Sequence, residues 1–430
     1  MGCAGQSLQK EREIAKKPEP RLIHCGDFID VVSERTLHDI DIRVDENGQI
    51  ELVEVHHEHP IGYKVIDLSK YVVLPGLIDM HVHLTTSVED YAHLNQHVNL
   101  TREQLISRSL KNARAMLDQG FTTVRDLGAY HGWSNIELKN LIATKGELGP
   151  RIFAAPFYLT ISRGGGDLSK ADLGENHARE LRLGVALGPN QFRARAKEAV
   201  DGGADWLKVI ASGAVLSSGA SPGQPEMTEE EIRAVVEVAH AAGKKVAAHA
   251  HGAQSIKDAI RAGVDTIEHA SLIDDEGLKM AKEVHVPLVM DIYNGDFLDR
   301  DAKAQGLPQE FIDKNKNITE AQRQNFTKAV KGGIILPFGT DAGVYPYGEN
   351  AKQFKVMVDR GMTPIQAIQS ATIIAAKTLG ESQKVGLLNP GRFADLIAVE
   401  NDPLKDITTL ERVCIVIKGG TITTVNHCHR

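Results

Sequence analysis

The middle of the chain alternates short apolar runs with amphipathic helical stretches, and few folds accommodate that repeat. Eight runs rich in aliphatic or β-branched residues lie near Leu77–Met80, Thr122–Asp126, Arg151–Ala154, Trp206–Ile210, Val246–His249, Thr266–Glu268, Pro287–Met290 and Ile334–Phe338. The helical patterns between them are clearest at Arg102–Gln119, Gln191–Gly202, Glu229–Gly243 and Ala253–Gly263. Strands that alternate with helices favour parallel pairing, and eight such units close a barrel. The sequence therefore predicts an α/β fold, a (β/α)8 TIM barrel, over residues 74–389.

Both ends of the chain instead show short strands joined by turns. Residues 21–73 contain several such runs, and Asp45-Glu46-Asn47-Gly48 is typical of a hairpin turn. Residues 390–430 contain apolar runs at Ala394–Val399 and Val413–Ile417, followed by a last short strand. Because the two β segments flank the barrel, we expect them to form one small β-sandwich domain into which the barrel is inserted.

Residues 1–20 are polar and are expected to form a mobile leader. The pair Gly2-Cys3 resembles the end of a bacterial lipoprotein cleavage site, but no apolar segment precedes it. A cytoplasmic location and, if a signal was trimmed there, a periplasmic or membrane-anchored one both stay open. No stretch of the sequence approaches the ~20 apolar residues that span a bilayer.

Charge and cysteine content exclude two further classes of site. The formal net charge is -8, whereas a nucleic-acid-binding protein usually presents a basic face. The four cysteines form no CxxC pair, so a thiolate zinc site is not expected. We expect free thiols, although a disulfide between Cys25 and Cys414 stays open because both could lie on neighbouring strands.

The strongest chemical signal is His81-Val82-His83 at the end of the first barrel strand. Side chains two residues apart on a strand point the same way, so the two imidazoles converge on one point. That point lies at the carboxyl end of the strand, where TIM-barrel active sites are built. A pair of surface histidines is the alternative interpretation.

Lys208 lies within the apolar strand Trp206–Ile210. Burial of an ammonium without a partner is energetically costly. One solution is a salt bridge. The other is carbamylation by carbon dioxide, which converts the cation into a carboxylate that can bridge two metal ions.

Three further candidates end later strands. His249 and His269 are separated by one helix-containing repeat, and Asp341 follows the last strand. His251 could replace His249 by strand alternation; we favour His249 because Gly252 indicates that the strand is ending, which leaves His251 to contact substrate or support the ligands. Asp341 could bind a metal and accept a proton from the attacking water, although an aspartate there is also common as a helix cap.

Taken together, these residues resemble the binuclear pattern of the amidohydrolase superfamily over about residues 21 to 425. The flanking segments Leu74–Asp79 and Gly391–Leu396 are similar to that superfamily's first barrel strand and its return to the small domain. The segments Lys208–Gly219 and Pro225–Glu231 look most like the imidazolonepropionase-like branch. That branch includes metal-dependent prolidases, C-terminal carboxypeptidases and ochratoxin-hydrolysing amidohydrolases.

The resemblance implies two divalent metal ions, with zinc the best match to imidazole and carboxylate ligands. His81, His83 and Asp341 would bind one ion, His249 and His269 the other, and carbamylated Lys208 both. It also implies hydrolysis of an amide bond by a metal-activated water, with Asp341 passing the proton to the leaving amine. Relatives of this kind are often oligomeric, so a homo-oligomer is expected.

We expect a substrate with a free carboxylate beside the amide: an N-acyl amino acid or a dipeptide, including ochratoxin-like compounds. Tyr130 and His131 follow the second strand and Arg163 follows the third, and any of them could bind the carboxylate. Arginine suits it best because of its two-pronged geometry, although Arg163 could equally face solvent. The glycine-rich region Ile161–Pro189 is expected to form a long loop over the site.

Three rival functions differ in their residues or substrates. A deaminase usually lacks the bridging lysine and carries a glutamate where Gly252 stands. A non-catalytic relative would be expected to lose metal ligands. Cyclic-amide hydrolysis, as in imidazolonepropionase, shares the fold and is separated only by its substrate.

His56-His57-Glu58-His59 also looks like a cluster of metal ligands. It falls in an expected turn of the small domain, so a solvated loop is predicted there.

Overall fold

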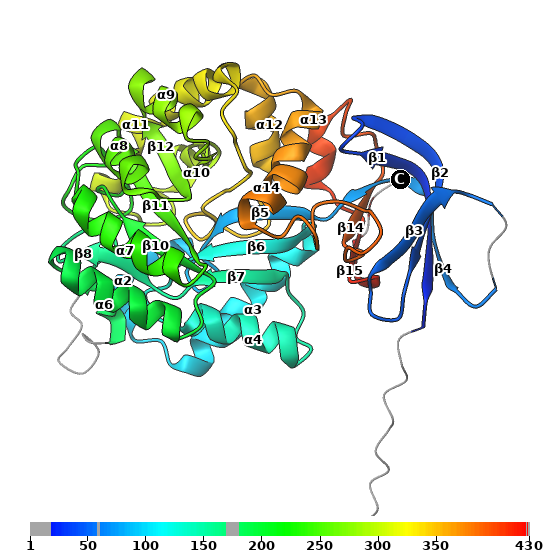
Figure 1. The fold of residues 1–430 in the computed structure, drawn as a ribbon, viewed down its shortest axis with the longest axis horizontal. Coiled ribbons are helices and arrows are strands. Elements are labelled where there is room, and N and C mark those ends of the chain that lie inside the picture. Colours follow the sequence, from blue (N-terminus) through cyan, green and yellow to red (C-terminus); the bar gives the residue numbers. More distant parts are fainter. Residues whose placement is uncertain (1–18, 58–60, 169–179, 427, 429–430) are drawn as a thin grey trace, which may run out of the picture.

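The computed structural model describes residues 19–57, 61–168, 180–426 and 428. The expected leader thus lies outside the described residues, except for its last two positions. A large α/β body and a smaller β-sheet stand side by side, and the chain passes from the sheet into the body and back again (Figure 1).

Strands from both ends of the chain form the smaller part. The N-terminal segment contributes β1 (Arg21–Asp30), β2 (Arg35–Val44), β3 (Ile50–Val55) and β4 (Lys64–Pro75). The C-terminal segment contributes β14 (Leu396–Val399), β15 (Ile415–Lys418) and β16 (Thr421–Val425). They form one seven-stranded sheet in the order β16-β15-β14-β4-β1-β2-β3. The antiparallel pairing of β14 with β4 therefore joins the two ends in a single sheet, not in two separately paired layers.

The α/β body contains two parallel sheets. The first consists of β5 (Leu77–Val82), β6 (Phe121–Leu127) and β7 (Arg151–Ala155). The second consists of β8 (Tyr158–Ile161), β9 (Val185–Ala186), β10 (Trp206–Ile210), β11 (Lys245–Gly252), β12 (Thr266–Leu272) and β13 (Leu288–Val289). Seven of the eight predicted barrel runs therefore contain strands, and neighbouring strands run in the same direction.

The eighth predicted run, near Ile334–Phe338, is extended chain and not an assigned strand. It still links the two sheets, because the Leu288 amide donates to the Ile335 carbonyl (3.0 Å) and the Met80 amide to the Phe338 carbonyl (2.9 Å). At the other edge, the Asp205 amide donates to the Ala154 carbonyl (2.9 Å). These links are compatible with an eight-stranded barrel.

The main helices follow the predicted pattern with ends shifted by a few residues. The helices are α1 (Val88–Ala92), α2 (Leu94–Val98), α3 (Arg102–Asp118), α4 (Ser134–Thr144), α6 (Gly188–Asp201), α7 (Glu229–Ala241), α8 (Ala253–Ala262), α9 (Asp275–Glu283), α10 (Asn294–Asp301), α11 (Gln309–Gly332), α12 (Lys352–Asp359), α13 (Pro364–Gln369) and α14 (Ala375–Leu379). Short 3-10 turns η1 (Glu180–Arg182) and η3 (Ile407–Glu411) and the π-helical turn η2 (Ser370–Ile374) complete the set. Capping boxes at Thr101 and Thr228 explain where α3 and α7 begin.

The cysteines correct the sequence-based expectation. Cys414 and Cys428 form a disulfide, with Cα atoms 5.5 Å apart, and Cys25 is a free, buried thiol. The two bonded residues flank the hairpin β15–β16, whose antiparallel pairing sets Ile415 opposite Val425. The expectation of free thiols is therefore wrong for Cys414 and Cys428 and correct for Cys25, which lies on β1, separated from β15 by β4 and β14.

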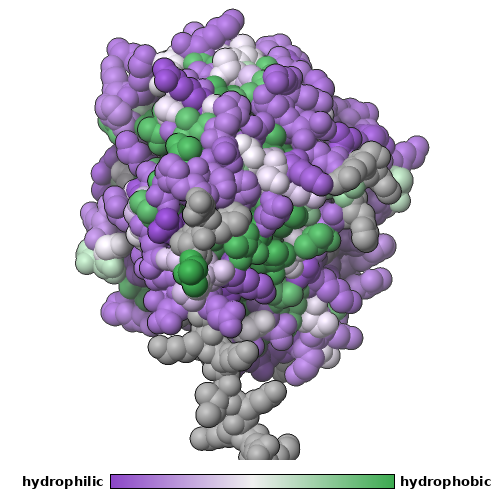
Figure 2. Space-filling view, turned by 90° about the vertical axis from the view of Figure 1, so that its right-hand side faces the viewer, coloured by the Kyte–Doolittle hydropathy of each residue, from purple (hydrophilic) through white to green (hydrophobic). Residues whose placement is uncertain are grey.

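The surface seen in Figure 2 is mostly hydrophilic, with a hydrophobic patch near its centre. Strands β2, β3 and β4 of the small sheet expose Leu37, Leu52 and Val65 by 37% to 41%. Apolar surface of this kind can support association between subunits, but the homo-oligomer stays a prediction. None of the described helices has the length and apolar character needed to cross a membrane.

Candidate active site

The predicted histidine pair at the end of β5, His81 and His83, lies close to the predicted aspartate Asp341. Nε2 of His81 and Nε2 of His83 lie 3.4 and 3.2 Å from Oδ1 of Asp341. All three residues are buried, and one ligand atom from each falls within 4.8 Å of the others. Their arrangement can therefore hold one metal ion.

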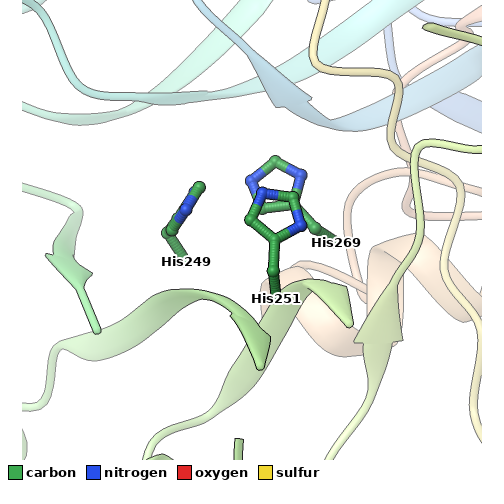
Figure 3. Close-up of side chains that lie close together, drawn as sticks. All are labelled: His249, His251 and His269. Atoms are coloured by element: carbon green, nitrogen blue, oxygen red, sulfur yellow. The ribbon is translucent and has the colours of Figure 1, made fainter. Parts of the chain in front are cut away.

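A second cluster adjoins the first. His249 and His251 on β11 and His269 on β12 point toward one another, and the ring of His251 stacks on that of His269 (Figure 3). The three ring centroids are 4.5 to 4.7 Å apart, and His269 is also 5.0 Å from the ring of His81. The structure thus brings His251 into the cluster beside His249, and the choice of His249 as the ligand stays a prediction.

Lys208 lies on β10 and lines the same pocket as both clusters. Its Nζ atom is 3.4 Å from Nε2 of His81, and the described residues place no carboxylate within ion-pairing distance of it. Burial lowers the pKa of Lys208 to about 8. A salt-bridged lysine, one of the two solutions considered for this strand, is therefore not what the structure shows.

Burial also keeps the imidazoles neutral. It lowers the pKa values of His81, His249 and His251 well below the ordinary range and that of His269 to about 4. A neutral imidazole carries a lone pair on one nitrogen and is the form that binds metal. The four rings are thus in the protonation state of ligands at neutral pH.

Neighbouring groups orient two of the rings. Nδ1 of His83 faces the Gly128 carbonyl oxygen at 3.0 Å, and Nδ1 of His269 faces Oδ1 of Asp291 at 3.0 Å. An N–H at Nδ1 leaves Nε2 as the lone-pair nitrogen, so these contacts fix which atom faces the site. Asp291 was not predicted, although it directly follows the seventh predicted strand, as Asp341 follows the eighth.

A buried ion pair supports His81 from the interior of the α/β body. Nη2 of Arg125 is 2.8 Å from Oε1 of Glu268, and both side chains are fully buried. Oε2 of Glu268 lies 3.0 Å from Nδ1 of His81, and neither of these two atoms makes an aligned hydrogen bond with a described residue. A small rotation of the ring would let Nδ1–H donate to Glu268. Arg125 also lies 4.4 Å from the ring centroid of Trp206.

Asp79 ties the end of β5 to the segment that carries Asp341. Its carboxylate accepts hydrogen bonds from the Thr340 hydroxyl (2.6 Å), the Thr340 amide (3.1 Å) and Asn350 (3.0 Å). Burial raises the pKa of Asp79 to about 7. The sequence showed Asp79, Arg125 and Glu268 only as charged residues in apolar strands, which does not reveal their partners.

The predicted substrate contacts divide into three groups. Tyr130 and His251 line the pocket of the two clusters, together with Tyr91 and Tyr158. Arg163 is exposed and lines a smaller neighbouring pocket that shares Tyr91, Tyr130 and Gly165 with the first. His131 does not line the pocket, because its Nε2 turns to the His97 carbonyl oxygen at 2.9 Å.

The predicted loop over the site is described only in part. Gly165 and Gly166 line the pocket, and the Gly165 amide donates to Glu226 at 2.8 Å. Residues 169–179 of the same region lie outside the described residues. The described portion has the expected position beside the site, but it is not a loop throughout, because it contains η1, β9 and the start of α6.

With this geometry established, similarity to known proteins identifies the family. The model of the Amidohydrolase family matches residues 72–423, so the chain belongs to that family. As a member of this family, the chain is a hydrolytic enzyme. Members of the family generally bind divalent metals, and the chain contains candidate His/Asp ligand groups.

Individual relatives narrow the comparison. The chain is 29% identical to ochratoxinase of Aspergillus niger over 373 residues, which cover 82% of this chain and 75% of the relative. It is 24% identical to imidazolonepropionase of Fusobacterium nucleatum over 364 residues, 77% of each chain. Among solved structures, a Xaa-Pro dipeptidase with methionine bound in its active site is 35% identical, with a TM-score of 0.88, over 94% of this chain and 99% of that one.

The buried ion pair beneath His81 gives the first prediction. Glu268→Gln should lower the free energy of unfolding by about 3–5 kcal/mol, because it leaves the Arg125 guanidinium buried without its counter-charge. The measurement is the shift of the urea unfolding curve. Glu237→Gln is the matched control, since Glu237 pairs with Arg193 on the surface and should change stability by less than about 1 kcal/mol. Equal shifts for the two variants would contradict the role given to Glu268.

Proposed function

We propose that the enzyme is a binuclear metal-dependent amidohydrolase that cleaves an amide bond next to a free carboxylate, in N-acyl amino acids or dipeptides. The observation that carries this proposal is the pair of adjoining ligand clusters with Lys208 between the strands that supply them. One cluster contains His81, His83 and Asp341, the other His249, His251 and His269. Lys208 lines the pocket with both.

The donor set fits two divalent ions. Neutral imidazoles and a carboxylate are the ligands that zinc prefers, and six or more of them exceed the needs of one tetrahedral ion. His81, His83 and Asp341 would hold one ion, and His249 and His269 the other. When bound, the ions would supply an activated water and a positive charge that polarises the scissile carbonyl.

Lys208 would join the two ions as a carbamate. Its amine is buried, lacks a carboxylate partner among the described residues and has a pKa of about 8, so an appreciable fraction is neutral near pH 7. Only the neutral amine carries the lone pair that attacks carbon dioxide. The resulting carbamate would remove the cation that burial destabilises.

Asp341 would move the proton. Its Oδ1 atom lies within 3.4 Å of both β5 histidines, at the point where their Nε2 atoms converge. From there it can accept a proton from the attacking water and deliver it to the amine that leaves. The Thr340 hydrogen bonds to Asp79 would keep this segment in place during the transfer.

The pocket and the relatives favour a substrate with a carboxylate. Tyr91, Tyr130 and Tyr158 supply hydroxyl groups and aromatic surface, and Arg163 supplies a cation in the adjoining pocket. By their names, one relative acts on ochratoxin and another on Xaa-Pro dipeptides, and the latter holds a free methionine in its active site. An acyl group would then face the tyrosines, and the carboxylate would face the side of Arg163.

Lys208 is tested by metal content and by chemical rescue. Lys208→Ala should lower the metal content from about two ions per chain and abolish most activity, because the bridging ligand is lost. Acetate or propionate should restore part of the activity by standing in for the carbamate. Elemental analysis and turnover after loading with zinc and bicarbonate are the measurements. Normal turnover of Lys208→Arg, which cannot form the bridge, would exclude the role.

Asp341→Asn keeps the size of the side chain but removes its basicity. We expect turnover to fall by ~10²–10⁴, the usual range for loss of a general base. The measurement is kcat at neutral pH, with metal content determined on the same sample so that loss of an ion is recognised. Near-normal kcat would rule out Asp341 as the proton shuttle.

The carboxylate preference is tested with paired substrates. The C-terminal amide of an N-acyl amino acid should be cleaved with kcat/KM about 10²-fold below that of the free acid, since a charged binding group loses its partner. Arg163→Ala should narrow this difference, and Arg193→Ala, a surface control, should leave it unchanged. Equal cleavage of acid and amide by the unmodified enzyme would favour a general amidase or a cyclic-amide hydrolase.

A further inference from the structure

A third group of potential metal ligands lies on the small sheet, outside the candidate active site. It consists of His24 on β1, Asp41 on β2 and His56 just after β3. The strand register explains the grouping, because His24 stands directly opposite Asp41 and their side chains share a face. His56 follows the pairing of β3 with β2, and its amide donates to the Asp39 carbonyl at 2.7 Å.

The side chains converge on the carboxylate. Nδ1 of His24 lies 2.9 Å from Oδ1 of Asp41, and Nδ1 of His56 lies 2.9 Å from Oδ2. The two ring centroids are 4.4 Å apart, and one ligand atom from each residue falls within 4.8 Å of the others. His56 lies in the segment just after β3, where a loop was predicted, and its ring also takes part in this cluster. Glu58 and His59 lie outside the described residues.

Burial distinguishes this group from an ordinary surface cluster. The Asp41 side chain is 3% exposed, and those of His24 and His56 are 15% and 27% exposed. A carboxylate removed from water in this way requires a cation or several hydrogen-bond donors. Two imidazoles and a metal ion meet that requirement.

The distances suit a small tetrahedral ion. Ligand atoms ~2.0–2.1 Å from a zinc ion are ~3.3 Å from one another in tetrahedral geometry. The two nitrogen–oxygen distances need to open by only a few tenths of an ångström to accept such an ion. Oδ1 of Asp39 lies 3.5 Å from Nε2 of His24, so a carboxylate also backs the ring on the side away from Asp41.

We infer that His24, Asp41 and His56 form a separate zinc-type metal site that fastens β1, β2 and the end of β3 together. Two ligands lie on β1 and β2 and the third lies just after β3, all within one sheet. None of the three lines the pocket of the candidate active site, so the role is structural. An ion bound only by the folded sheet stabilises it by mass action. The site is independent of the proposed amide hydrolysis, since none of its residues lines the pocket of the candidate active site.

The test compares the zinc content of His56→Ala with that of the unmodified full-length protein. Both are saturated with Zn²⁺ and freed of excess ions, and their folding is checked by circular dichroism. His56→Ala should contain one zinc per chain fewer, and amide hydrolysis should be unchanged. The difference does not depend on how many ions the active site holds, so this experiment can fail or succeed apart from the proposed function.

His24→Ala should show the same loss, and His38→Ala is the matched control. His38 lies on β2 and contacts Asp27 at 2.7 Å, but it does not belong to the cluster. It should retain the full zinc content. Added zinc should also raise the melting temperature of the His38→Ala protein more than that of His56→Ala. Equal zinc contents in the unmodified protein and the three variants would overturn the site. An equal loss of zinc in His38→Ala would also overturn it, because that loss would indicate nonspecific binding to surface histidines.

Discussion

Neighbouring strands of the α/β body run parallel, and this single constraint gathers the chemistry of the protein at one edge. Parallel strands end at the same side of a sheet, so residues far apart in the chain meet there. His81 and His83 lie at the end of β5, and Lys208 lies on β10. His249 and His251 lie on β11, and His269 lies on β12. The small sheet is mixed, with β1 and β4 parallel and its other strand pairs antiparallel, and its own cluster arises from direct cross-strand pairing of His24 with Asp41.

Burial then sets the protonation states of the side chains that lie at this edge. Desolvation disfavours charge, which keeps the imidazoles of His81, His249, His251 and His269 neutral and brings the pKa of Lys208 to about 8. Groups that stay charged in the same interior have partners, as Arg125 has Glu268. The site therefore presents lone pairs toward the pocket and keeps its compensating charges behind the ligands.

How far the site could be predicted depended on whether a residue's role follows from its position on one strand. His81, His83 and Asp341 stand at the ends of predicted apolar runs, and this position together with the resemblance to the amidohydrolase superfamily singled them out. The same position at the end of the seventh run would also have pointed to Asp291. Glu268 and Arg125 could not be assigned, because their partners lie on other strands.

The dependence on contacts with other strands also explains where the fold differs from the sequence-based prediction. The runs of the barrel follow from local apolar patterns, and their order was predictable. The disulfide between Cys414 and Cys428 depends on the register of a hairpin, and the Asp41 cluster depends on which strands become neighbours. Neither register is encoded in spacing along the chain. His131 illustrates the same point, since its turn toward His97 follows from helix packing and not from its place after a strand.

We propose that two metal ions are held between His81 and His83 at the end of β5 and the histidines of β11 and β12. The most direct measurement is anomalous diffraction at the zinc absorption edge from crystals grown with zinc and bicarbonate. The account predicts two peaks in this pocket, one beside His81, His83 and Asp341 and one beside His249 and His269, with electron density for a carbamate on Lys208 between them. A single peak at full occupancy, with an unmodified lysine, would contradict it.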